Sequence, residues 1–100
     1  MITVSPGTTV RLWIRYQENG VDVPDLTDLK VSAYDVSGTA VFTDQTLTEN
    51  DTLGEYEYSW DTTGIAIESN IRVYFKKGTD YLYSEDYYFD ITEDMDGRTV

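Results

Sequence analysis

The sequence predicts a single all-β domain that folds as a sandwich or a closed barrel. Seven segments of alternating apolar and polar residues fill the chain from Ile2 to Ile91, separated by turns rich in Gly, Asn and Asp. The chain has 100 residues, a common size for one domain, and shows no helical period. Because successive side chains of a strand point to opposite faces, each segment buries one face, and the strands must stack so that these faces meet.

The first half of the chain is expected to hold four strands, at residues 2–4, 10–16, 29–34 and 40–46. A Pro-Gly turn at Ser5 to Gly7 separates the first two. Asn19-Gly20 is a strong turn signal, but its neighbours favour a loop wider than a two-residue hairpin. The apolar residues expected to face the core in the second and third strands are Val10, Leu12, Ile14, Tyr16, Leu29, Val31 and Ala33.

The second half is expected to hold three more strands, at residues 56–60, 71–75 and 81–92. Rings alternate with polar residues in the first of these, so Tyr56, Tyr58 and Trp60 are expected in the core together with Val73 and Phe75. Residues 61–68 are expected to cross between sheets in a Greek-key connection, with Ile65 and Ile67 plugging the end of the sandwich. The last strand should pair with the strand before it.

The alternation stops after Ile91, which divides the chain into a domain at residues 1–92 and a short acidic C-terminal tail at residues 93–100. We expect the tail to be held by a neighbouring subunit, so Met95 and Val100 are candidate partner contacts. The first strand begins at once, without the basic and apolar regions of a signal peptide. No apolar run approaches the length of a membrane span.

The charge of the chain limits its partners. Nineteen acidic residues against seven basic ones give a net charge of −12. Such a field repels nucleic acid and anionic membranes, so neither is an expected partner. Solubility or adaptation to salt accounts for this negative charge most simply. The more specific alternatives are a partner with a basic patch and mimicry of DNA.

The composition indicates a protein that is not an enzyme and needs no cofactor or metal. His and Cys are both absent, which removes the usual general base, the thiol nucleophile, disulfides and thiolate metal sites. Asp86 and Asp90 form a possible carboxylate pair, but they fall on the exposed side of the last strand. Calcium ligands are conceivable at residues 22–28 and 49–51, although ordinary solvated loops are the favoured interpretation.

Aromatic residues are in excess, with nine Tyr, two Trp and three Phe. Some rings fall on the outward side of their strands, where large apolar groups are unfavourable unless something covers them. Tyr and Trp are common anchors of protein interfaces, so these rings are candidate partner contacts; packing across neighbouring strands and stacking on sugars are the alternatives. The outward rings are Trp13, Tyr34, Tyr74, Tyr81 or Tyr83, and Tyr88.

Three segments resemble the free-standing immunoglobulin-like, or macroglobulin-like, domains of bacterial and bacteriophage virion proteins. They are the SPGTTVRL segment from Ser5 to Leu12, the LKVSAYDVSG segment from Leu29 to Gly38, and the GEYEYSW segment from Gly54 to Trp60. The resemblance spans residues 5–91 and implies a seven-stranded antiparallel β-sandwich with a Greek-key connection. The chain lacks the Cys pair of antibody domains, so membership of the antibody superfamily is not implied.

By this resemblance, the expected function is that of a structural protein of a bacteriophage particle, assembled in the host cytoplasm and located in the virion. Capsid decoration, head-to-tail connection and a tail accessory role are all compatible with it. The expected partners are other virion structural subunits, with homo-oligomerisation in the assembly as a further option. The competing hypotheses are an acidic DNA mimic that inhibits a nucleic-acid-binding protein, and a glycan-binding or adhesion module.

Overall fold

The computed structural model describes residues 2–90 and consists of strands, turns and loops, without a helix in that range. The ten strands are β1 (Ile2–Val4), β2 (Thr9–Arg15), β3 (Gln17–Glu18), β4 (Val21–Asp22), β5 (Leu29–Asp35), β6 (Ala40–Thr46), β7 (Thr48–Glu49), β8 (Glu55–Asp61), β9 (Ser69–Lys77) and β10 (Asp80–Phe89). The expected all-β class is confirmed. The expected count of seven is not, because β3, β4 and β7 are short additional strands.

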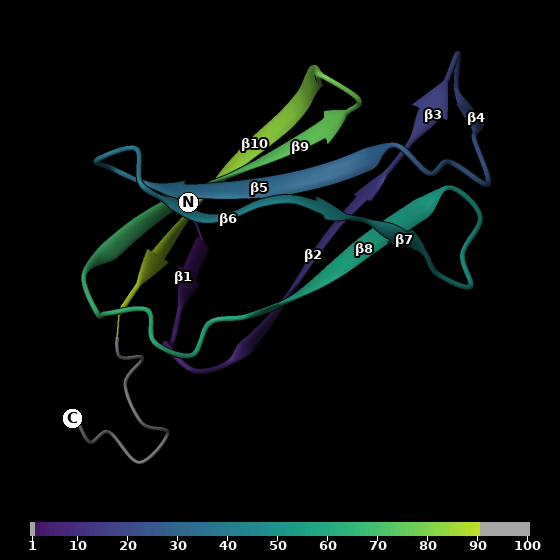
Figure 1. Cartoon of the computed structure of the whole chain (residues 1–100). Helices are drawn as coiled ribbons and strands as arrows, with labels where there is room; N and C mark the ends of the chain where they lie inside the picture. Colours follow the sequence, from purple (N-terminus) through teal and green to yellow (C-terminus); the bar gives the residue numbers. More distant parts are fainter. Residues whose placement is uncertain (1, 91–100) are drawn as a thin grey trace.

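The strands form two main sheets and one small hairpin (Figure 1). The larger sheet has the order β1-β10-β9-β5-β6, the smaller one has the order β2-β8-β7, and β3 pairs with β4. All pairs are antiparallel except β1 with β10, which is parallel. Apolar side chains of both main sheets share one core, an arrangement consistent with a β-sandwich.

The period-2 alternation identified the core correctly. Leu12, Trp60, Val73 and Phe75 are at most 2% exposed, and Val10, Ile14 and Tyr58 pack against them half-buried. Trp60 is the centre of an aromatic cluster, with ring centroids 5.4–5.8 Å from those of Phe42, Tyr87 and Phe89. The buried Leu47 and Tyr87 were not among the predicted core residues.

Two connections differ from the sequence-based expectation. Asn19 and Gly20 form a two-residue hairpin turn after all, since Glu18 pairs directly with Val21 and both turn residues have positive φ angles of 53° and 78°. This is the backbone that an Asn-Gly turn favours, and it outweighed the polar flanks. Residues 61–68 do cross from the smaller to the larger sheet, but only Ile65 packs on the core, whereas Ile67 is 48% exposed.

The last strand ends earlier than expected in the described range, at Phe89 rather than Thr92. It pairs with β9, as predicted, and additionally with β1 through Tyr87 to Phe89. The predicted boundary between domain and tail, and with it Met95 and Val100, lies outside the described residues.

Candidate interaction surface

The outer face of the five-stranded sheet carries three of the predicted contact residues. The inward face of β5 and β9 is occupied by core residues such as Val31 and Val73, so the alternate residues of both strands point outward. Tyr34 of β5 and Tyr74 of β9 lie on this outer face, and Tyr88 of β10 shares it, opposite Asn70 in the register. The predicted outward orientation of these rings is therefore confirmed.

Three tyrosines form a row across β5, β9 and β10, which we call the tyrosine row (Tyr34, Tyr74 and Tyr81). The ring centroids of Tyr34 and Tyr74 are 6.0 Å apart, and those of Tyr74 and Tyr81 are 5.5 Å apart. Both pairs are edge-to-face, with interplanar angles of 64° and 68°. Each pair is diagonal in the strand register, a spacing that aromatic side chains can bridge. Tyr74 is half-buried between its neighbours, while Tyr81 is 68% exposed.

A β-bulge brings Tyr81 into this row. Tyr81 pairs with Lys76 and Tyr83 pairs with Phe75, so Leu82 is an extra residue in β10. An extra residue exchanges the faces of the positions that follow it. Tyr81 therefore lies on the outer face with Tyr74, whereas Tyr83 lies on the inner face, where its ring centroid is 6.1 Å from that of Phe75. Sequence alternation alone left open which of the two tyrosines points outward.

Ion pairs border the tyrosine row. Arg72 donates two hydrogen bonds to Asp86, from Nε to Oδ1 at 2.6 Å and from Nη2 to Oδ2 at 2.9 Å. These bonds lower the pKa of Asp86 and raise the pKa of Arg72. Lys76 Nζ donates to Asp44 Oδ1 at 2.6 Å, which lowers the pKa of Asp44, and also lies 5.8 Å from the ring centroid of Tyr81.

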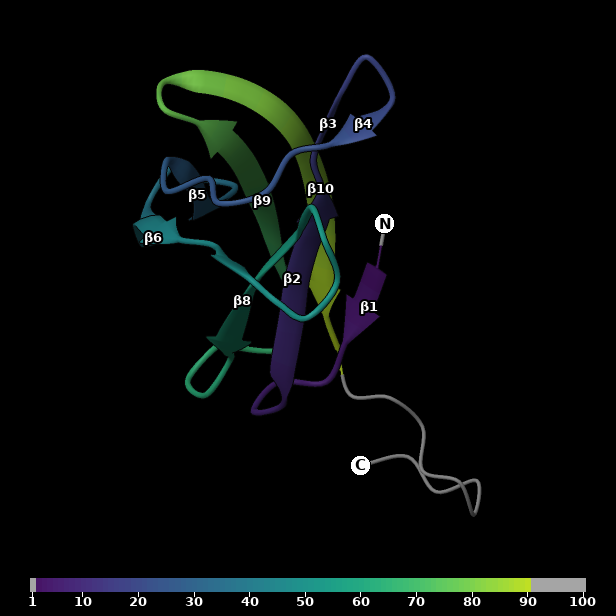
Figure 2. The ribbon, with the colours of Figure 1, turned by 90° about the vertical axis from the view of Figure 1, so that its right-hand side faces the viewer.

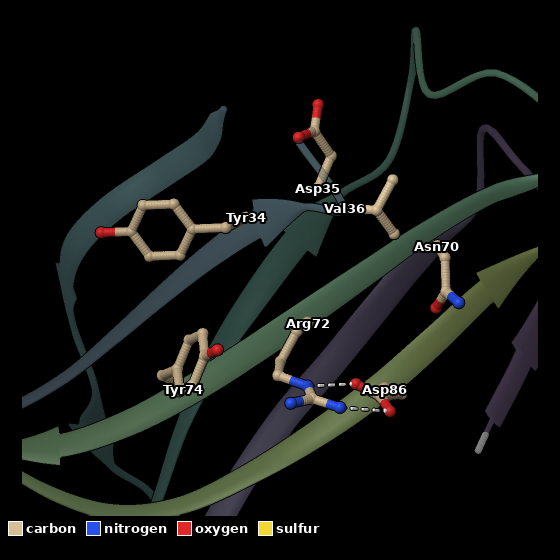
Figure 3. A pocket seen from close by; sticks show the side chains of 7 residues that line it. All are labelled: Tyr34, Asp35, Val36, Asn70, Arg72, Tyr74 and Asp86. Carbon is tan, nitrogen blue, oxygen red and sulfur yellow. Dashed lines mark hydrogen bonds and ion pairs between the residues drawn. The ribbon is translucent and has the colours of Figure 1, made fainter. Parts of the chain in front are cut away.

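A shallow hollow of about 280 Å³ opens between the tyrosine row and the Arg72–Asp86 pair (Figure 3). The rings of Tyr34 and Tyr74 lie on one side of it and the bidentate ion pair on the other. Asp35 fixes the turn at its rim, because its carboxylate accepts hydrogen bonds from the backbone N–H groups of Ser37 and Thr39. The remaining lining residues are Val36 and Asn70. The hollow offers ring surfaces, amide and guanidinium groups, which suit a polar or aromatic side chain of another protein.

Trp13 lies away from this face. It belongs to β2, at the edge of the smaller sheet, and is 48% exposed, with the guanidinium carbon of Arg11 5.1 Å from its ring centroid. The structure thus divides the predicted contacts between two surfaces: Tyr34, Tyr74 and Tyr88 on one, and Trp13 on the other. Arg72 was not identified from the sequence as a partner of Asp86. The only indication in the sequence was that both residues fall on the outward side of neighbouring strands.

In the two acidic loops that are candidate calcium sites, the carboxylates of Asp22 and Glu49 accept hydrogen bonds from other residues of the chain. Asp22 accepts hydrogen bonds from Arg15 Nε at 2.9 Å and Gln17 Nε2 at 2.8 Å, and the Arg15 bond is the largest cause that lowers its pKa to about 2. Glu49 accepts from the backbone N–H of Asp25 at 3.1 Å and of Gly54 at 3.0 Å. Among residues 2–90 no three acidic side chains gather in a way that could hold a metal ion.

No family model, curated protein or solved structure matches this chain. The described part of the chain has no helix with the length and apolar character needed to span a membrane.

Proposed function

We propose that the chain is a non-enzymatic structural protein that docks to other protein subunits, with the tyrosine row as its docking surface. The observation that carries this proposal is the contact of three tyrosines across three strands on an outer sheet face. Beside them, Arg72 and Lys76 are each paired with a carboxylate of the same chain. Tyrosine supplies large contact area for little conformational entropy and is enriched where interfaces bind most tightly. Ion pairs around such a centre provide the polar rim of an interface.

An immunoglobulin-like Greek-key sandwich is the finer architecture we propose. The two strand orders, β1-β10-β9-β5-β6 and β2-β8-β7, support it, as do the chain crossings from β2 to β5, from β6 to β7 and from β8 to β9. In this arrangement the outer face of the larger sheet is a broad, rigid platform. The fold by itself implies no particular function.

The assembly we propose is a bacteriophage particle, in which the chain would decorate the capsid, connect head and tail, or accompany the tail. The resemblance of the segments that begin at Ser5, Leu29 and Gly54 to virion domains suggests this setting. The partners would be other virion subunits or further copies of the chain.

The two competing functions have less support. A DNA mimic needs free carboxylates spaced like phosphates, but Arg72 and Lys76 neutralise carboxylates on the outer face through ion pairs. A sugar-stacking platform needs flat, accessible ring faces, whereas Tyr74 is enclosed edge-to-face by Tyr34 and Tyr81.

Lysine acetylation of the chain in purified virions tests the proposal, because two of the three lysines lie on the proposed docking face and the third does not. Lys30 and Lys76 are paired neighbours on the outer face, whereas Lys77 is bonded to Asp28 at the end of β9 and serves as the matched control. We expect Lys30 and Lys76 to react several-fold more slowly in the particle than in the isolated chain, and Lys77 to react equally in both.

The Tyr81→Ser variant should lower the number of copies per particle, while Leu53→Ser, an exposed position on the β7–β8 loop, should not. Absence of the chain from virions would overturn the proposal. So would protection of Lys77 without protection of Lys30 and Lys76.

A further inference from the structure

A second surface runs along β10, where part of a strand edge has no partner among the described residues. β1 pairs with β10 only from Tyr87 to Phe89, and Figure 2 shows it beside that end alone. From Tyr83 to Asp86 the strand pairs with β9 on one side, in continuous register. β2, at the facing edge of the smaller sheet, pairs with β8 alone. Two open edges therefore flank one side of the molecule.

A groove of about 350 Å³ lies between these edges, and we call it the β10 groove. Its deepest residues, Phe75 and Tyr87, are 2% and 6% exposed. Its outer walls are exposed and apolar: Ile2 is 42% exposed, Trp13 48% and Tyr83 54%. An apolar cleft beside an open strand edge is the geometry that accepts an extended peptide as an added strand.

Exposed apolar side chains are concentrated at this edge. Nine large hydrophobic residues are exposed in the described chain, and three of them, Ile2, Trp13 and Tyr83, line the β10 groove. The exposed Leu82 lies next to Tyr83 on β10. The opposite edge of the same sheet, β6, is interrupted twice in its register and carries Asp44 with a φ of 49°, features that discourage strand addition. The β10 edge is regular from Tyr83 onward.

The charge of the edge selects the kind of partner. Glu85 lines the groove, and its carboxylate accepts a hydrogen bond from the Tyr83 hydroxyl. The groove's one basic residue, Arg11, is paired with Glu55 and Glu57. A second copy of the chain would bring its own charge of −12 and its own Glu85 to the same edge. A segment with basic residues has the complementary charge.

We propose that β10, from Tyr83 to Asp86, binds an extended basic–apolar segment of a partner protein as an additional β-strand. Main-chain hydrogen bonds to β10 provide the strand pairing, and alternate apolar side chains of the segment enter the β10 groove between Trp13 and Tyr83. A lysine or arginine on the same face of the segment pairs with Glu85, which lies on the groove side of β10 together with Tyr83. This surface is separate from the tyrosine row, so the chain would bind two partners at once.

Synthetic peptides serve as the probe, with binding followed by amide NMR of the full chain. A blocked peptide of about nine residues carries Val and one central Lys at the alternate positions that face the groove, and Thr at the positions between them. This Val/Lys peptide should bind saturably and shift the signals of Tyr83 to Asp86 and of the Trp13 indole. The same peptide with alternate amides N-methylated cannot form a strand ladder and should bind at least roughly tenfold more weakly, a loss of about 1.4 kcal/mol. The Val/Glu peptide, which has Glu in place of that groove-facing Lys, should not bind.

Two variants of the chain distinguish the contribution of the apolar groove to peptide binding from the contribution of the Glu85 charge. Trp13→Ala should weaken binding of the Val/Lys peptide, whereas Leu53→Ala, at a somewhat more exposed position on the β7–β8 loop, should not. Glu85→Lys should transfer the preference to the Val/Glu peptide, and this gain of binding could not arise from misfolding. Binding of the N-methylated peptide with unchanged affinity, shifts confined to other strands, or self-association of the chain through β10 would each overturn the proposal.

Discussion

The hydroxyl of Tyr56 offers a sharp test of what holds the loop after β4 to the sandwich. Tyr56 is fully buried, and its hydroxyl donates a hydrogen bond to the backbone oxygen of Val23 at 2.7 Å while accepting one from the backbone N–H of Leu26 at 3.1 Å. Tyr56→Phe keeps the ring and removes both bonds. Two partly buried backbone groups then lose their partner, so the free energy of unfolding should fall by about 1–3 kcal/mol.

Tyr58→Phe is the matched control, because Tyr58 lies two residues along the same strand on the same face, and its hydroxyl makes no hydrogen bond within the described residues. Its effect should be near zero. Urea unfolding, with the same slope of free energy against urea concentration for both variants, gives the two changes in the free energy of unfolding. Hydrogen exchange of the Leu26 amide should accelerate in Tyr56→Phe alone. Equal effects of the two variants would show that the hydroxyl of Tyr56 does not anchor the loop.

Two further predictions concern pH. Hydrogen bonds from Arg15 first and from Gln17 second lower the pKa of Asp22 to about 2 in the folded chain. This carboxylate therefore stabilises the fold above its ordinary pKa near 4, and the contribution is lost as pH falls toward 2. Arg15→Gln removes the larger cause, so acid titration of this variant should show a smaller loss of stability over that range. Burial raises the pKa of Tyr87 to about 12. The neutral Tyr87 hydroxyl therefore stabilises the fold fully below about pH 10, and this stabilisation is lost as pH rises to about 12. Alkaline unfolding of Tyr87→Phe, monitored at the tyrosinate absorption band, should therefore shift to higher pH.

The core was predictable because burial is a property of alternation within one strand. In β2, for example, Leu12 is fully buried while its neighbour Trp13 is 48% exposed. This pattern depends only on the two faces of a strand and needs no knowledge of which strand lies beside it. Ile67 shows the limit of the approach, because it lies in a crossing segment where no alternation applies.

Strand pairing was harder to predict than burial, because it depends on where single residues are inserted. A regular hairpin closed by Lys77 and Asp80 would place Glu85 opposite Arg72 and turn Asp86 toward the core. With the extra residue at Leu82, Asp86 lies opposite Arg72 outside, and Tyr87 and Phe89 are buried. The burial of two rings and the exposure of a carboxylate thus favour the bulge. The sequence contains this information, but only when burial and register are considered together.

The candidate surfaces were only partly predictable for the same reason. Tyr34 and Tyr74 were identified as outward rings, yet nothing in their spacing shows that they touch, because β5 and β9 are distant in sequence. The β10 groove is a consequence of the short length of β1, which covers only Tyr87 to Phe89. The alternation of apolar and polar residues along the sequence does not show how far one strand extends along its neighbour.

One residue connects the two proposed surfaces. The insertion of Leu82 places Tyr81 on the outer face, where it completes the tyrosine row, and Tyr83 on the inner face, where it forms a wall of the β10 groove. Leu82 itself is 41% exposed between them, and a hollow of about 310 Å³ joins Tyr74, Tyr81 and Tyr83 around it. Bulges are tolerated where they redirect a side chain that the molecule uses. Here one bulge directs Tyr81 and Tyr83 of the same strand to the two proposed surfaces.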